Sequence, residues 1–238
     1  MAIKKPISTP NRGGGIELYL KRIFALMFGA VAITAVSSWL TMNFGLELIF
    51  NFQRGGFTPM FYILMFGGLA LSIWAQVRAF HLKPATGAAI LAIYSVIIGV
   101  VITPLVFSAL MVNPASIWQA FFLAALMFAS MALFGYKTAK DLGFLGIFLF
   151  MGMIGLILVG VASFIWPLGS TFATIICAIG VLVFALFTAY DMQFLKKAYA
   201  MGGTETQKNQ LAVLGALHLY IAFIAMFQHI LALLNMRR

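Results

Sequence analysis

The amino-acid sequence predicts an all-α integral membrane protein with seven transmembrane helices. Of the 238 residues, 63% are hydrophobic and only 8% are charged, which is typical of chains that lie in a bilayer and argues against a water-soluble domain. Apolar stretches of roughly 20 residues, the length that crosses a bilayer core as a helix, recur along the chain. These stretches lack strict polar and apolar alternation, so helices are favoured over the strands of a membrane barrel.

The seven apolar stretches occupy nearly all of the chain after residue 22. We predict spans at residues 23–42, 57–77, 87–107, 116–135, 143–161, 170–190 and 211–234. The connections between them are short, so no room remains for a second, soluble domain. We therefore divide the chain into a basic cytoplasmic N-terminal tail at residues 1–22 and a single seven-helix transmembrane domain at residues 23–238.

The first three spans are recognised by the residues near their ends. The first follows the bases Lys21 and Arg22 and holds Trp39 close to its far end, while the second holds Trp74 close to its end. Tryptophan rings favour the headgroup region, so both are expected to anchor their helices there. The third span contains Pro104, which lacks a backbone donor and predicts a kink in that helix.

The last four spans carry small and ionisable residues. The fourth has Trp118 near its start. The fifth contains glycines that should let another helix of the same chain approach closely. These glycines are Gly143, Gly146, Gly152, Gly155 and Gly160. The sixth ends at Tyr190 and is followed by Asp191, and the seventh contains His218 and His229 but no acid.

The basic residues predict how the chain is oriented in the membrane. With the N-terminus in the cytoplasm, twelve of the 15 Lys and Arg residues fall in inner segments, and only Arg54, Arg237 and Arg238 fall outside. This asymmetry predicts a cytoplasmic N-terminus and an outer C-terminus. The final two arginines would themselves prefer the cytoplasm, which leaves open a last helix that stops short of the far side. Topology also explains the net charge of +10, so the expected partner is the lipid bilayer and not nucleic acid.

Asp191 is the residue that points most directly to function. It follows a long apolar run, and an ionisable group at membrane depth is costly enough to mark a functional site. Two placements are open. The carboxylate is either buried in the bundle or held at the inner headgroup level, close to Lys196 and Lys197.

Residues 180–193 form an apolar stretch that ends in Tyr190-Asp191, with Gln193 two residues later. This stretch resembles the most distinctive segment of the Bax inhibitor-1 family, the transmembrane BAX inhibitor motif proteins. Residues 99–105 and 140–145 provide weaker matches. The chain is identified as a bacterial member on a resemblance that covers almost everything beyond the N-terminal tail.

The resemblance implies a central seventh helix wrapped by two layers of three helices, in the inner (plasma) membrane. Family members are associated with calcium leak and pH sensitivity. In calcium-leak members, an acid at the end of the sixth helix faces a second acid in the seventh, and the pair shares a proton. Asp191 matches the first acid, but the alignment places Ala222 at the position of the second.

His218 is a candidate substitute for the missing acid. It lies four residues before Ala222, on the same helix face. A pair of Asp191 and His218 would attract, and the imidazole would then be the group that titrates near neutral pH. A histidine that simply bonds to a carbonyl or hydroxyl is the structural alternative.

We therefore expect an ion-homeostasis protein, such as a calcium leak channel with altered pH sensing. A non-conducting protein that modulates other membrane proteins is the alternative. We expect no enzymatic activity, because an intramembrane aspartyl protease needs two carboxylates. We expect no cofactor and no resident metal, since calcium takes about six to eight oxygen ligands and the spans supply one acid. Calcium ions and unidentified membrane proteins are the remaining candidate partners.

Overall fold

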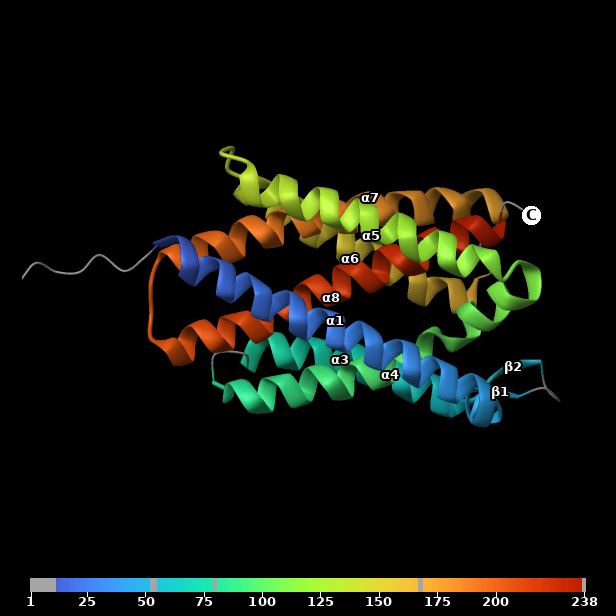
Figure 1. Cartoon of the computed structure of the whole chain (residues 1–238). Helices are drawn as coiled ribbons and strands as arrows, with labels where there is room; N and C mark the ends of the chain where they lie inside the picture. The colour runs from blue at the N-terminus through green and yellow to red at the C-terminus, as the bar shows by residue number, and fades with distance from the viewer. Residues whose placement is uncertain (1–11, 52–54, 79–80, 167–168, 237–238) are drawn as a thin grey trace, which may run out of the picture.

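The computed structural model of the protein describes residues 12–51, 55–78, 81–166 and 169–236. These residues form an almost entirely helical bundle, as the sequence predicts (Figure 1). Seven of the described helices are long and apolar enough to cross a membrane. They are α1 (Arg12–Phe44), α3 (Pro59–Arg78), α4 (Pro84–Val112), α5 (Ala115–Lys137), α6 (Gly143–Ile165), α7 (Ser170–Ala200) and α8 (Glu205–Met236).

A small folded connection joins α1 to α3. It consists of the single turn α2 (Leu46–Ile49) and a hairpin of β1 (Phe50–Asn51) with β2 (Gly56–Phe57). The paired residues Phe50 and Phe57 also place their rings edge to face at 5.8 Å. Because Phe57 belongs to this hairpin, the second span begins at Pro59 and not at residue 57 as predicted.

Several helices extend beyond the apolar runs that predicted them. α1 begins at Arg12, so the predicted boundary at residue 22 falls inside a helix, while residues 1–11 lie outside the described residues. The extra turns of α1 are held by packing, because Tyr19 is buried and its ring lies 4.9 Å from that of Tyr199 near the end of α7. α7 likewise continues past Tyr190 to Ala200, so Asp191 lies within a helix and not at its end.

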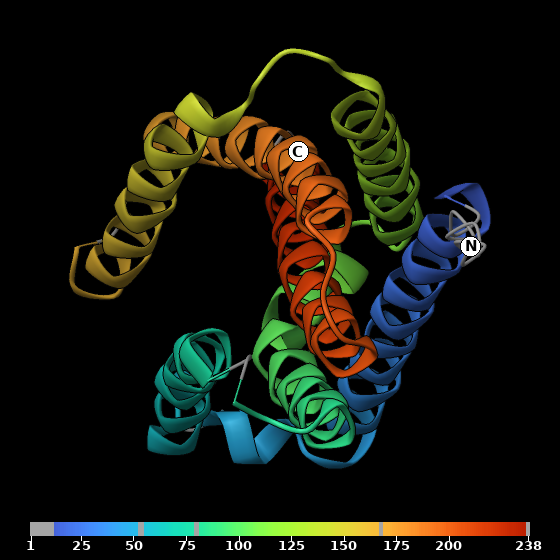
Figure 2. The same ribbon diagram turned by 90° about the vertical axis from the view of Figure 1, so that its left-hand side faces the viewer.

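α8 is the central helix of the bundle, as the resemblance implied. Two thirds (67%) of its most apolar 18-residue stretch is buried, against 6% for α6. α1, α3 and α4 pack together on one side of α8, and α5, α6 and α7 form the second layer on the other (Figure 2). α3 packs mainly on α4, and α6 mainly on α7, so these two helices lie at the outer edges of their layers.

Glycines allow close approach at some helix contacts but not along the whole of α6. A Cβ atom at Gly146 would lie 2.7 Å from the Tyr190 ring, and one at Gly152 would touch Val183, so these two glycines face α7 as predicted. Gly155 and Gly160 have nothing within 4 Å of such an atom, and the prediction of close packing is wrong for them. The reason is that α6 packs mainly on α7, and Gly155 and Gly160 lie away from this contact.

The described connections with predicted inner bases lie at one end of the bundle. α1 begins at the same end as the α3–α4, α5–α6 and α7–α8 connections, and α8 finishes at the other (Figure 1). The 32 residues of α8 span roughly 48 Å, more than the ~30 Å of a bilayer core, so this helix is long enough to cross fully. Arg54, Arg237 and Arg238 lie outside the described residues, and the side of the membrane on which each end lies stays a prediction.

Candidate functional site

Asp191 lies buried between α7 and α8. Its residue surface is only 2% exposed, because α7 continues for more than two turns beyond it and packs on α8. The sequence left two placements of Asp191 open, and the structure shows its carboxylate buried in the bundle rather than exposed at the headgroup level. A carboxylate at this depth needs a compensating partner.

His218 of α8 supplies that partner. Its Nδ1 atom lies 3.4 Å from Oδ1 of Asp191, so the predicted contact between the two helices is confirmed. This separation is within ion-pair range but longer than an ordinary hydrogen bond. The His218 side chain is 23% exposed while that of Asp191 is 3% exposed, so the imidazole is the member of the pair that is closer to the surface.

Both members of the pair keep an unused polar atom. Oδ2 of Asp191 and Nε2 of His218 are buried and make no hydrogen bond to any residue that the structure describes. Buried polar atoms are almost always satisfied, so an unsatisfied pair of this kind calls for a functional explanation. Oδ2 of Asp191 can accept a hydrogen bond or bind an ion. Nε2 of His218 can donate or accept a hydrogen bond, depending on where the imidazole holds its proton.

A cavity of about 210 Å³ adjoins the pair. Its lining includes Gln76 of α3, Phe150 of α6 and Ala222 of α8. The volume exceeds the ~30 Å³ that a water molecule occupies in the liquid several times over. Ala222 is 1% exposed, so an acid at this position would face the same cavity as Asp191.

The charge of the pair depends on how many protons it holds. With one proton, an acid and an imidazole are together neutral, either as carboxylate with imidazolium or as two neutral groups. Loss of that proton leaves one negative charge beside the cavity, and gain of a second leaves one positive charge. Two acids with one shared proton would instead carry a negative charge, so replacing the second acid by Ala222 reduces the attraction for cations at the same level of protonation.

Gln193, two residues beyond Asp191, fixes the connection that leads into α6. Its side chain accepts a hydrogen bond from Leu142 N at 2.8 Å and donates one to Lys140 O at 2.7 Å. The sequence marked Gln193 as part of the family segment but gave no partner for it. A buried amide next to a buried acid was the available signal, since such an amide must bond to something.

Asp141 strengthens the same connection from the outside. Its Oδ1 accepts hydrogen bonds from Lys197 Nζ at 2.6 Å and from the backbone N of Gly143 at 3.0 Å. The bond from Lys197, followed by the bond from Gly143 and the charge of Lys197, holds the pKa of the Asp141 carboxyl below its ordinary value. The carboxylate is exposed, so this contact positions the α5–α6 connection more than it stabilises the fold.

A hydroxyl cluster holds the opposite face of α8. The Tyr220 hydroxyl lies 2.6 Å from Thr34 Oγ1, and Thr34 Oγ1 lies 3.1 Å from Ser95 O. Both hydroxyl residues are buried, so α1, α4 and α8 are joined by polar contacts inside the bundle. Sequence reasoning missed this cluster, although a tyrosine in the middle of a span usually needs a partner for its hydroxyl.

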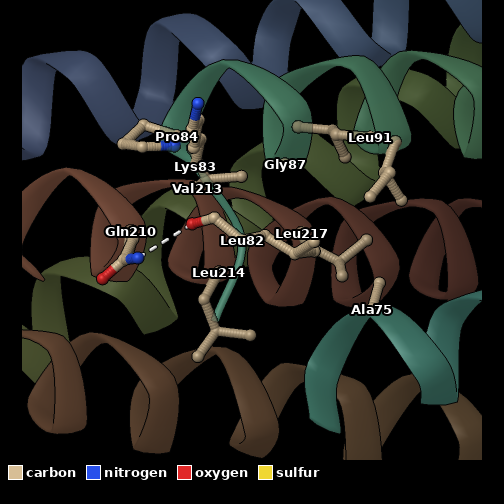
Figure 3. Close-up of a pocket in the computed structure, with 11 residues that line it drawn as sticks. Ala75, Leu82, Lys83, Pro84, Gly87, Leu91, Gln210, Val213, Leu214 and Leu217 are labelled. Atoms are coloured by element: carbon tan, nitrogen blue, oxygen red, sulfur yellow. Dashed lines mark hydrogen bonds between the residues drawn. The ribbon is translucent and has the colours of Figure 1, made fainter. Parts of the chain in front are cut away.

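The start of α8 packs against α3, α4 and the connection between them. Gln210 Nε2 donates to Leu82 O at 2.8 Å, and Leu214 and Leu217 lie beside Ala75 around a cavity of only about 30 Å³ (Figure 3). This packing joins the start of α8 to α3 and α4.

The described residues contain no group of three or more His, Cys, Asp or Glu side chains that could hold a metal ion. Asp191 and His218 together offer two carboxylate oxygens and one or two nitrogens. That set is too small for the oxygen-rich coordination that calcium prefers.

Comparison with known proteins agrees with the geometry. The family model described as "Inhibitor of apoptosis-promoting Bax1" matches residues 16–238. A protein of Caulobacter vibrioides is 36% identical over 91% of the chain and 86% of its own length. The Escherichia coli inner membrane protein YbhL is 31% identical over 94% of both chains, and a Rickettsia prowazekii protein is 30% identical over 94% of the chain and 92% of its own length.

Proposed function

The chain belongs to the Bax inhibitor-1 family of multi-pass membrane proteins, and from that membership we propose that it is a slow, proton-sensitive leak pathway for calcium. The observation that carries the proposal is the buried contact between Asp191 and His218 beside a cavity. The name of the relative YbhL supports a place in the bacterial inner membrane. The distribution of bases supports a cytoplasmic N-terminus.

In this proposal, the proton on the Asp191 and His218 pair sets the cation affinity of the cavity. At a pH where the pair holds no proton, it carries one negative charge beside the cavity and attracts a cation. Acidification through the range in which the imidazole titrates protonates His218, makes the pair neutral and so weakens the attraction for cations. The protein acts as a passive pathway and not as an enzyme, because the pair has no partner acid to divide acid and base roles.

The replacement of the second acid makes this a weaker pathway than one with two acids. Ala222 contributes a methyl group to the cavity wall where a carboxylate would add a negative charge. We therefore propose a low calcium flux whose pH response is carried by the imidazole.

A non-conducting role is the second candidate, and two observations favour it. The packing of Leu214 and Leu217 beside Ala75 leaves a cavity of only about 30 Å³ at the end where α8 begins. α6 also presents large apolar side chains outward, including Phe144, Ile147 and Phe148, and so offers a helix face for another membrane protein. In this role the Asp191 and His218 contact would serve to align α7 with α8.

Flux into liposomes distinguishes the two functions. The purified full chain is reconstituted around a calcium-sensitive dye, and influx is compared with that of empty liposomes across about pH 6 to pH 8, the range in which histidine titrates. If the protein conducts calcium, influx should exceed that of empty liposomes, and the Asp191→Asn substitution should reduce this influx. Influx equal to the control at every pH contradicts conduction and supports the non-conducting role.

A further inference from the structure

A second polar pocket lies far from the Asp191 and His218 pair, where α1 begins and α7 passes into α8. Its volume is about 410 Å³. It lies between helices that are distant in sequence but adjacent at this end of the bundle (Figure 2). The lining residues that matter here are Tyr19 and Arg22 of α1, Tyr199 of α7, and Glu205, Lys208 and Asn209 of α8.

Two cations line this pocket in a fixed arrangement. The Arg22 guanidinium donates a hydrogen bond to Asn209 Oδ1, which ties α1 to α8. Lys208 Nζ lies 5.3 Å from the centre of the Tyr199 ring, and it also contacts Glu205 Oε1 at 3.0 Å. The Glu205 side chain is 83% exposed, so this ion pair is solvent-screened and easily exchanged for another anion.

A buried hydroxyl completes the pocket. Tyr19 is 7% exposed, and its hydroxyl makes no hydrogen bond to any residue in the described ranges. Tyr19 lines the pocket, and its ring is held by the ring of Tyr199. A buried hydroxyl without a partner among the described residues, in a pocket that two cations also line, is the arrangement expected where an anion is bound.

We propose that this pocket binds a phosphate group, carried either by an anionic lipid headgroup or by a free phosphate. Arginine presents paired donors that match phosphate oxygens, lysine adds a point charge, and a tyrosine hydroxyl donates a further hydrogen bond. Arg22 directly precedes the first apolar run, which puts the pocket near the level of lipid headgroups. The phosphate displaces Glu205 from Lys208, so the acid acts as a competitor for the site.

Binding to the purified full chain in detergent tests the proposal. Short-chain phosphatidylglycerol, short-chain phosphatidylcholine and inorganic phosphate are titrated separately, and bound ligand is measured by native mass spectrometry with the unfolding temperature as a second readout. Stabilisation by phosphatidylglycerol alone identifies a lipid headgroup as the ligand. Stabilisation by inorganic phosphate as well identifies the phosphate group by itself as sufficient. Equal binding of both lipids without any phosphate effect overturns the proposal.

Variants test whether the named residues form the site. Arg22→Gln and Lys208→Gln should each weaken binding on the order of tenfold, as expected for loss of a charge-assisted hydrogen bond, and Tyr19→Phe should weaken it less. Glu205→Gln should tighten binding because the competing acid is gone. Lys21→Gln removes the same charge from the neighbouring residue, which does not line the pocket, and should leave binding unchanged. Equal losses in Lys21→Gln and Arg22→Gln would show diffuse charge attraction and contradict a built site.

Discussion

Nδ1 of His218 and Oδ1 of Asp191 lie 3.4 Å apart, and the contact joins the central helix α8 to α7 inside the bundle. Two acids facing each other would repel unless they shared a proton, whereas this acid and base attract. The chemistry of this contact therefore differs from the two-acid pair that the resemblance implies for calcium-leak members.

Restoring the second acid should create a two-acid switch. Because Ala222 lines the same cavity as Asp191, Ala222→Asp places a second carboxylate there, and the pair then holds a proton with a net negative charge. Calcium flux into liposomes should rise and acquire a new pH dependence. Adding Asp191→Asn should remove that pH dependence. A pH dependence that survives the double substitution would contradict the pairing of Asp191 with the new acid.

His218→Ala should destabilise the protein more than removal of a histidine elsewhere. It leaves the buried Asp191 carboxylate without its partner, and breaking a buried ion pair costs on the order of 3–5 kcal/mol. The His218 side chain is partly exposed, so we expect a loss of stability near the lower end of this range. The free energy of unfolding in detergent measures the loss.

Two further variants serve as controls for this prediction. Asp191→Asn combined with His218→Ala should recover part of the stability, because the uncompensated charge is gone. His229→Ala removes an imidazole that bonds to Ala225 O of its own helix and should leave Asp191 undisturbed. Equal destabilisation by the single and double substitutions would mean that the two side chains are not coupled.

The hydroxyl cluster should contribute measurably to stability. Tyr220→Phe removes the hydroxyl that lies 2.6 Å from Thr34 Oγ1, and the expected loss is about 1 kcal/mol. Thr34→Ala tests the other side of the contact. Because the two substitutions remove one shared interaction, their effects on unfolding free energy should be less than additive, and strict additivity would contradict the contact.

Gly135 should be intolerant of any side chain. A Cβ atom at this position would collide with the backbone carbonyl of Ala189, so Gly135→Ala must push α5 away from α7, at an expected ~1–3 kcal/mol. Gly155→Ala is the matched control, since nothing lies within 4 Å of a Cβ atom there. The control should be neutral or slightly stabilising, because alanine is the better helix former. Similar losses in both variants would argue against the close contact of α5 and α7.

Asp141 should remain ionised to unusually low pH. Lys197 and Gly143 hold the pKa of its carboxyl below the ordinary value of 3.8, so this group favours the folded state above that pH and loses its contribution as pH falls through the lower folded pKa. An NMR titration that follows the Asp141 carboxyl carbon measures the midpoint of its protonation. Lys197→Gln should move it back toward 3.8, and an unchanged midpoint would contradict the contact.

The sequence predicted the elements of this fold whose signals are long and apolar. All seven spans exist, and the contact of Asp191 with α8 was anticipated from the resemblance of the segment that ends in Tyr190-Asp191 to that of the family. The helical extensions to Arg12 and Ala200 were missed because hydropathy marks the bilayer core and not the ends of helices. The role of Tyr220 was missed for a different reason, since the helix that its hydroxyl faces depends on how α8 is rotated in the bundle.

The pH dependence of calcium flux in wild-type and His218→Ala liposomes tests most directly whether the imidazole carries proton sensing. Wild-type protein should show a low influx that decreases on acidification through the range in which the imidazole titrates. His218→Ala should flatten this response across about pH 6 to pH 8, while His229→Ala should preserve it. Strong acid-gated influx in the wild type that survives His218→Ala would contradict the account, because another group would then carry the titration.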